Sequence, residues 1–129
     1  MIEHIGIWTE NLEEMKKFYC RYFNGKSNEK YINKLKGFES YFISFEGNAR
    51  LELMKRHDID QRSYKEILGF AHLAFKIGSK EKVDEITELL RKDGYKVAGE
   101  PRVTGDGYYE SVILDPENNK KRAVAFCKL

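Results

Sequence analysis

The sequence is poor in cysteine, proline and tryptophan, and it contains no long apolar run. Two cysteines, two prolines and one tryptophan occur among its 129 residues. The cysteines form neither a C-x-x-C pair nor a disulfide framework, which indicates a reduced compartment, and we expect the cytoplasm. No segment approaches the roughly 20 apolar residues of a membrane span. Strand-like residues begin at Met1, where a signal peptide would stand. No membrane partner is therefore expected.

An excess of charge of either sign is also missing. The chain has 23 basic and 21 acidic side chains, for a formal net charge of +2. Such a balance argues against nucleic acid as a partner, because a basic surface is needed to bind phosphates. The content of 41% hydrophobic and 34% charged residues is typical of a soluble globular protein. A chain of this length can form one domain with its own core.

Histidine is a third scarce residue, and its placement reveals an internal repeat. Two of the three histidines, His4 and His72, open runs of the form His-apolar-small-apolar, HIGI and HLAF, sixty-eight positions apart. Each run is followed by an amphipathic, charge-rich segment that ends at a glycine, Gly25 in the first copy and Gly94 in the second. A period this long indicates a duplicated supersecondary unit, because solenoid repeats are shorter and more numerous.

Each copy has the pattern of a β-α-β-β-β unit. Helical spacing of apolar residues follows Asn11 and Ser79, which are suitable caps, and Gly25 suits a left-handed helix end. The expected strands are residues 2–8, 29–34, 40–45 and 49–54 in the first copy, and 70–77, 95–98, 108–114 and 123–127 in the second. We also expect a short helix at 61–68 and a loop at 99–107.

These elements predict an α+β fold made of two βαβββ modules. The first module covers about residues 1–55, the linker about 56–69 and the second module about 70–129 of a single domain. Each module has an apolar sheet face to bury, so we expect the two to pair into a curved, barrel-like sheet with the helices outside. A cavity between the sheets is then the expected ligand site.

The repeated histidines and one acid are the candidate metal ligands. His4 and His72 occupy equivalent positions and should lie near one another across a pseudo-two-fold axis, and imidazole is a common ligand for Zn, Ni or Fe. Glu52 stands in mid-strand between apolar residues, where a charge is costly unless it is paired or bound to a cation. The alternative is a hydrogen-bonded structural role for the histidines and a solvent-facing glutamate.

Four stretches together resemble the glyoxalase/bleomycin-resistance/extradiol-dioxygenase superfamily, also called vicinal oxygen chelate. They are HIGI at 4–7, LEL at 51–53, GFAHLAF at 69–75 and GYYESVILDPEN at 107–118, and the resemblance covers essentially the whole chain. It implies paired βαβββ modules with metal ligands on the first and fourth strands of each, which here are His4, Glu52 and His72. It also implies a divalent metal (Zn, Ni or Mn), a small-molecule substrate and a homodimer.

The fourth ligand of the resembled family belongs on the last strand, and here the sequence departs from the pattern. Aligning Asn48 with Asn118 puts Arg122 opposite Glu52, and no Asp or Glu follows Glu117. A guanidinium repels a divalent cation but can fork onto an anionic group. We therefore expect Arg122 to bind substrate and the metal site to lack one carboxylate.

Glu110 is the candidate replacement for that carboxylate. It lies between Tyr109 and Ser111 on an expected strand, and side-chain alternation decides whether it faces the cavity. If it does, it joins Glu52 as a catalytic carboxylate. If it does not, it faces solvent or pairs with Arg122 or a lysine. Tyr109 is expected to bind substrate in the pocket or to pack in the sheet.

Three functions are consistent with the resemblance. The first is a metal-dependent lyase or isomerase, similar to lactoylglutathione lyase, that acts on a small α-oxo compound or its thiol adduct, with a carboxylate moving the proton. The second is a non-catalytic, drug-sequestering binding protein of the same fold without the full metal site. The third is a regulatory subunit that has lost the site, with Lys120, Lys121 and Arg122 as an anion-binding surface.

Overall fold

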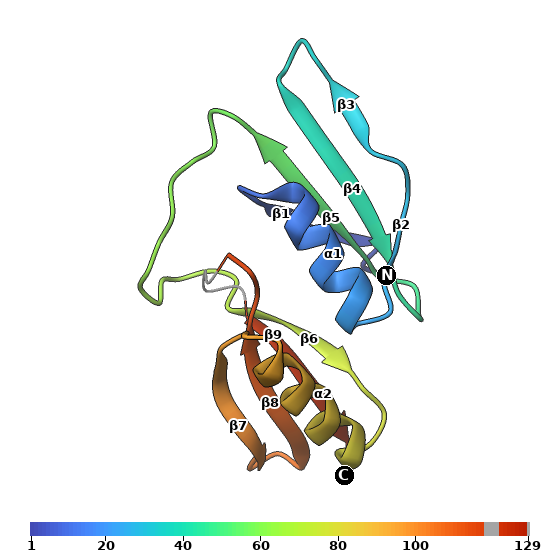
Figure 1. The fold of residues 1–129 in the computed structure, drawn as a ribbon, viewed down its shortest axis with the longest axis vertical. Coiled ribbons are helices and arrows are strands. Elements are labelled where there is room, and N and C mark those ends of the chain that lie inside the picture. The colour runs from blue at the N-terminus through green and yellow to red at the C-terminus, as the bar shows by residue number, and fades with distance from the viewer. Residues whose placement is uncertain (118–121, 129) are drawn as a thin grey trace. The chain divides into compact units, whose positions relative to one another are not determined.

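The computed structural model describes residues 1–117 and 122–128 and divides the chain into two compact units, Met1–Gln61 and Arg62–Leu129. The first unit contains β1 (His4–Trp8), α1 (Leu12–Tyr22), β2 (Lys26–Ser27), β3 (Tyr31–Asn33), β4 (Phe38–Ser44) and β5 (Arg50–Arg56) (Figure 1). The second contains β6 (His72–Lys76), α2 (Lys80–Lys92), β7 (Val97–Val103), β8 (Tyr108–Leu114) and β9 (Arg122–Lys128). The predicted α+β class is confirmed, with one helix and one mixed sheet in each unit.

The two sheets share one pairing scheme, and this supports the predicted repeat. In the first unit the strand order is β1-β5-β4-β2, with β3 also paired to β4. In the second unit it is β6-β9-β8-β7. In each unit the first and last strands run parallel as neighbours, and the last strand then pairs antiparallel with the strand before it. Equivalent strands therefore have equivalent neighbours.

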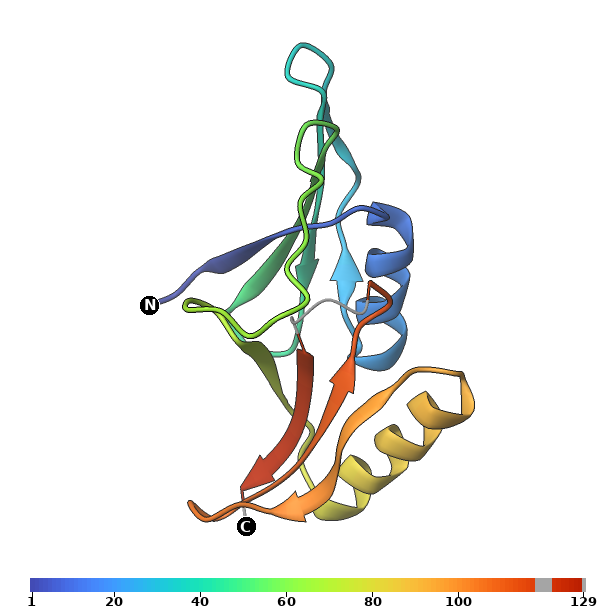
Figure 2. The same cartoon turned by 90° about the vertical axis from the view of Figure 1, so that its left-hand side faces the viewer.

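Each helix lies on one face of its own sheet (Figure 2). The Asn11 side chain caps α1 by accepting a hydrogen bond from the Glu14 amide at 3.1 Å, and Ser79 caps α2 in the same way. The side chains buried beneath α1 come from alternate strand positions: Ile7, Tyr41, Ile43, Leu51 and Leu53. Because alternate strand residues point to opposite faces, the residues between them form a second face that no helix of the same unit covers.

The end of α1 differs from its prediction. The residue with left-handed backbone is Asn24, at φ 55°, whereas Gly25 has no positive φ. Gly25 is instead needed for space, because a Cβ there would lie 2.5 Å from Ile43 Cγ2 and 3.1 Å from the Tyr19 carbonyl oxygen. Asparagine is the residue other than glycine that most readily adopts this conformation. After α2, Gly94 has a positive φ of 93°.

Gly25→Ala is expected to lower the free energy of unfolding by about 1–3 kcal/mol, because the new methyl group overpacks a buried contact. Urea unfolding measures the change. Gly105→Ala is the matched control, since a Cβ at residue 105 meets nothing within 4 Å and the backbone there is not left-handed. Equal stabilities for the two variants would contradict the steric explanation.

Two local predictions are wrong. Residues 61–71 contain no helix, although the pattern predicts one from Gln61 to Leu68, and Tyr64, Leu68 and Phe70 in this segment are exposed. The expected loop at 99–107 is strand up to Val103, with register shifts against β8. β7 is an edge strand, so Pro101 can lie in it without removing a ladder hydrogen bond. In the described ranges, no helix is long and apolar enough to cross a membrane.

Candidate functional site

The helix-free face of the first sheet brings His4 and Glu52 together. In the parallel pairing of β1 with β5, Glu52 lies opposite Gly6, two residues beyond His4 on the same face. His4 Nε2 is 3.7 Å from Glu52 Oε1. Gly6 leaves room for the end of Met54, which a Cβ would approach to 2.9 Å, whereas a Cβ would lie 4.0 Å from Glu52 Oε1, an ordinary contact distance. Two of the three predicted ligands are thus neighbours within one unit.

Their exposure suits a ligand pair. The Glu52 side chain is 18% exposed and that of His4 is 40% exposed, so both are partly desolvated but open to a small ion. Phe42, which lies opposite Glu52 on β4, packs the edge of its ring against His4 with centroids 5.1 Å apart. A half-buried carboxylate beside an apolar ring lacks part of its hydration, which favours a bound cation.

Sequence reasoning missed the side chains that surround His4. Glu3 Oε1 is 3.3 Å from His4 Nδ1, and Arg50 holds both oxygens of Glu3, with Nε 2.9 Å from Oε2. The Arg50 guanidinium holds the pKa of Glu3 at about 2 and lies 4.2 Å from the centre of the Phe42 ring. The sequence did contain one indication of Arg50, because it lies two residues before Glu52 on the same strand and therefore on the same face.

His72, the third predicted ligand, opens β6 in the second unit. Its backbone pairs with Arg122 as that of His4 pairs with Arg50, so the two histidines hold equivalent register positions. In the part of the chain that the structure describes, no three His, Cys, Asp or Glu side chains gather closely enough to hold a metal ion. The structure therefore brings together His4 and Glu52, while His72 belongs to a separately described unit.

The strand register corrects the predicted equivalence of Arg122 and Glu52. Ala74 pairs with Val124 in the second unit as Gly6 pairs with Glu52 in the first. Val124 therefore takes the place of the missing carboxylate, and Arg122 is the equivalent of Arg50. Valine has no ligating atom, so the repeat retains three potential ligands. Lys120 and Lys121, named as part of an anion-binding surface, lie outside the described residues.

Glu110 shares a face with His72 but lies far along the sheet. It pairs with Phe126, which pairs with Lys76, four residues beyond His72. At about 3.3 Å per residue and 4.8 Å per strand, this puts the Glu110 and His72 backbones roughly 16 Å apart. The Arg102 guanidinium lies 3.8 Å from Glu110 Oε1. The geometry does not favour Glu110 as a ligand or base beside His72.

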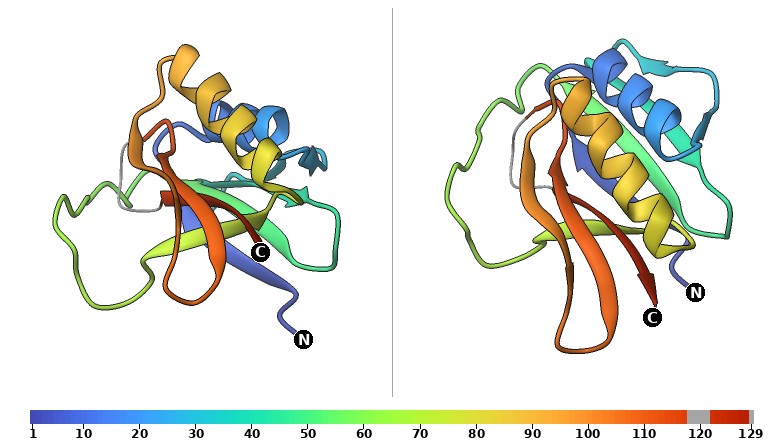
Figure 3. Two further views of the ribbon diagram at one scale, coloured as in Figure 1. Left: turned by 90° about the horizontal axis from the view of Figure 1, so that it is seen from below. Right: turned by 60° about the horizontal axis from the view of Figure 1, so that its bottom comes forward.

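The helix α2 covers the opposite face of the same sheet (Figure 3). Tyr109 points to that face. It is 9% exposed, and its hydroxyl donates a 2.6 Å hydrogen bond to Asp84 on α2. That bond, together with burial, raises the pKa of Tyr109 to about 12. Tyr108 is the tyrosine on the face of Glu110, with its ring 5.5 Å from that of Phe126. Tyr109 is expected either to bind substrate or to pack in the sheet, and these contacts support the packing role.

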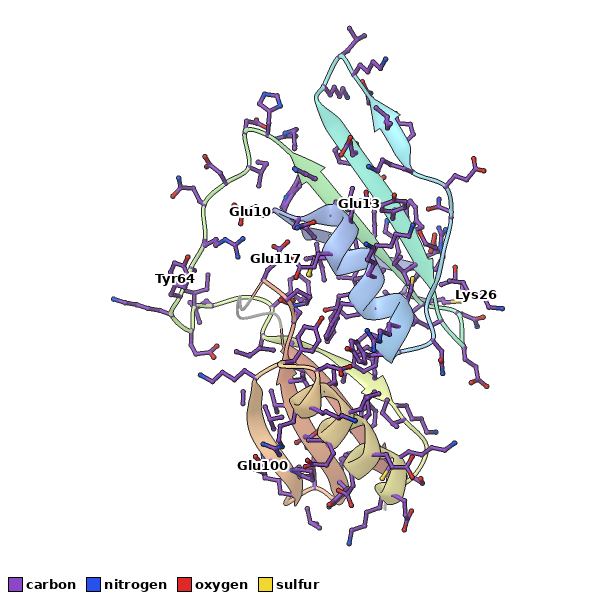
Figure 4. All side chains as sticks on the ribbon, viewed as in Figure 1. Glu10, Glu13, Lys26, Tyr64, Glu100 and Glu117 are labelled. Carbon is purple, nitrogen blue, oxygen red and sulfur yellow. The ribbon has the colours of Figure 1, made fainter. Side chains whose placement is uncertain are left out.

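The first unit repeats this contact. The hydroxyl of Tyr41 donates to Glu13, at the start of α1 (Figure 4), at 2.8 Å, and Lys16 lies 4.5 Å over the ring. In the second unit Lys80 lies 5.0 Å over the ring of Tyr109. Tyr41 and Tyr109 each tie a sheet to its helix, although they are not equivalent in register. Tyr41 pairs with Leu53, whereas Ala125, the counterpart of Leu53, pairs with Ser111. The hydrogen bond to Asp84 explains the position of Tyr109 without a ligand.

Comparison with known proteins gives a family-model match over residues 1–121, to the Glyoxalase/Bleomycin resistance protein/Dioxygenase superfamily. The uncharacterized protein YqjT of Bacillus subtilis (strain 168) is 27% identical over 130 residues, covering 96% of this chain and 98% of that protein. The glyoxalase family protein from Enterococcus faecalis is similar in structure, with a TM-score of 0.77 and 24% identity over 98% of this chain and 96% of that one.

Two structures with lower sequence identity also share the fold. The glyoxylase/bleomycin resistance protein/dioxygenase domain from Frankia sp. EAN1pec has a TM-score of 0.83 and 14% identity over 100% of this chain and 98% of that one. Glyoxalase I from Zea mays has a TM-score of 0.76 and 18% identity over 98% of this chain. The chain spans only 44% of that maize protein.

Proposed function

Because the chain belongs to the Glyoxalase/Bleomycin resistance protein/Dioxygenase superfamily, we propose that it is a metal-dependent lyase or isomerase. Its substrate is a small α-oxo compound or the thiol adduct of one. His4, Glu52 and His72 hold a divalent ion, Zn, Ni or Mn, in a single domain whose two modules pair. A homodimer and a cytoplasmic location belong to the same proposal and rest on the resemblance and on the cysteine content.

The observation that carries the proposal is the contact between His4 Nε2 and Glu52 Oε1. The contact of Nδ1 with Glu3 puts the proton of a neutral ring on Nδ1, since a carboxylate can only accept. Nε2 and Oε1 are then two acceptors facing each other at 3.7 Å. These two atoms would hold a divalent ion, whose positive charge would offset their repulsion. The donor set therefore fits the metal.

The chemistry requires one proton to move between adjacent carbons of the substrate. A bound divalent metal supplies a Lewis acid that polarises the carbonyl and stabilises the enediolate oxygens. Glu52 is placed to take the proton from the carbon beside the carbonyl and to return it to the neighbouring carbon, with no net change in oxidation state. His4 is held in place from its other side by Glu3 and by the edge of the Phe42 ring.

The test combines metal analysis with turnover. Protein purified without chelators should contain about one divalent ion per chain and convert the adduct of methylglyoxal and glutathione to a thioester. Glu52→Gln should lower kcat by about 10²–10⁴-fold, the usual contribution of a general base. Glu29→Gln, at an exposed acid of the same unit, is the control. No stoichiometric metal, and no activity after adding Zn, Ni or Mn, would rule the proposal out.

A drug-sequestering binding protein is the second candidate, and the valine at position 124 favours it. A site with one carboxylate has lost half of the acids that share proton transfer in the resembled family. The helix-free face also carries an aromatic surface that suits an apolar ligand: Trp8 packs against Phe38 at 6.1 Å, and Arg56 lies over Trp8 at 5.1 Å. Ligand-induced thermal stabilisation without turnover supports this candidate, and a metal-dependent product contradicts it.

A further inference from the structure

Four side chains of the first unit, His4 among them, form a closed set of contacts. Glu3 meets Nδ1, Arg50 binds both oxygens of Glu3, and Phe42 contacts both the Arg50 guanidinium and the His4 ring. The Arg50 amide also donates a 2.8 Å hydrogen bond to the Glu3 carbonyl, which fixes the Glu3 backbone beside β5. Each member therefore has two neighbours in the set, and the imidazole is held from two sides.

We propose that Glu3 and Arg50 are positioning residues that keep the His4 proton on Nδ1 and turn the Nε2 lone pair toward Glu52. The inference rests on the metal-dependent function proposed above. Neutral imidazole free in water prefers the proton on Nε2, which would block the ligand atom. An acceptor at Nδ1 reverses that preference and makes the ring a better metal ligand.

Arg50 prevents Glu3 from becoming a ligand itself. Both oxygens of Glu3 are taken up by the guanidinium, in a two-point ion pair that fixes the plane of the carboxylate. A carboxylate held in this way cannot turn toward the Nε2 side of the ring. Glu52, in contrast, has no such two-point partner among the described contacts and faces Nε2 directly. The two acids next to His4 thus have different roles.

The second module has the arginine but lacks the acid. Arg122 occupies the register position of Arg50, whereas the residue before His72 is Ala71, which cannot accept a hydrogen bond from an imidazole through its side chain. Of the two repeat-related histidines, only His4 therefore has this acid–arginine pair beside its ring. This difference predicts that the two repeat-related histidines respond differently to the same kind of substitution.

The test measures the His4 tautomer in metal-free protein by nitrogen-15 NMR at pH 8, above the ordinary pKa of histidine of about 6.5. In the wild type, Nδ1 of His4 should carry the proton. Glu3→Leu, which keeps the size and removes the acceptor, should shift the proton to Nε2 and weaken Zn binding by about 10–100-fold in calorimetry. Glu3→Gln retains an acceptor oxygen, so it should restore part of the Nδ1-protonated population of His4 and part of the Zn affinity. Glu29→Gln should change neither the tautomer nor the Zn affinity.

A wild-type His4 protonated on Nε2 would overturn the inference, as would a Glu3→Leu variant with unchanged tautomer and unchanged Zn affinity. If Glu3→Leu acted only by disturbing the fold, the variant would be less stable, and Glu3→Gln would recover neither the tautomer nor the Zn affinity. That outcome also contradicts a positioning role. If wild-type protein binds no Zn, Ni or Mn, the proposed function fails. The tautomer of the metal-free protein still decides the role of Glu3.

Discussion

His4→Ala and His72→Ala should each remove the bound divalent metal from the protein, with affinity lowered at least ~100-fold. Under the function proposed above, each imidazole is one of three protein ligands, and a two-ligand remnant would hold a divalent ion weakly in water. Calorimetric titration with Zn or Ni, together with metal analysis of the purified variants, measures the loss. Activity toward the α-oxo adduct should fall in parallel.

Stoichiometry makes this prediction sharper, because His4 and His72 come from different units. If they share one ion, the wild type binds one metal per chain and each single variant loses it. If they belong to separate sites, each single variant keeps the metal of the other, and the idea of a shared site fails. His57→Ala is the matched control, since the third histidine is exposed and its ring lies against Gly37 in the turn between β3 and β4.

The repeat was predictable because its signals are local. Caps at Asn11 and Ser79, helical spacing of apolar residues and two His-apolar-small-apolar runs indicate the same elements twice, and the structure contains them. Hydrophobic alternation also separates the helix-covered positions, such as Leu51 and Leu53, from Glu52 between them. That is why Glu52 could be named as a candidate ligand before its neighbours were known.

Register was not predictable, because it depends on the partner strand and not on the turn. Aligning the two copies at Asn48 and Asn118 assumes that the turn sets the register of the strand after it. The pairing of β9 with β6 instead puts Val124 opposite Ala74 and Arg122 opposite His72. The connection before β9 is longer than the one before β5, so the residue equivalent to Glu52 is Val124, two positions beyond Arg122. A shift of two residues leaves the same side chains on the same face of the sheet.

Side-chain direction on β8 was open for a related reason. Alternation says that Tyr109 and Glu110 face opposite ways, but not which of them faces α2. The hydrogen bond from Tyr109 to Asp84 fixes that choice. The contact of Glu3 with Arg50 also joins residues far apart in the sequence. The local sequence around each residue therefore gives no sign of the contact. Long-range contacts of this kind are the part of a site that composition and periodicity leave out.

Val124→Glu should tighten divalent metal binding by about 100-fold, or about 3 kcal/mol. The substitution puts a carboxylate at the register position that Glu52 holds in the first module, beside Ala74 as Glu52 is beside Gly6. It thereby supplies the fourth ligand that the resembled family has on its last strand. A second acid would also share proton transfer with Glu52, so kcat should rise with metal affinity. Calorimetry and steady-state kinetics measure the two effects.

Arg122→Glu is the matched control, because it adds the same side chain two residues earlier on the same strand and face. Direct ligation requires the position of Val124, whereas Arg122 holds the position that Arg50 has in the first module. Arg122→Glu should therefore change metal affinity only through long-range charge, by several-fold at low salt, and the change should fade as ionic strength rises. The effect of Val124→Glu should persist in high salt, because a bound carboxylate is not screened. If Arg122→Glu instead gave the larger, salt-resistant gain, the alignment through Asn118 would describe the site better than the strand register does.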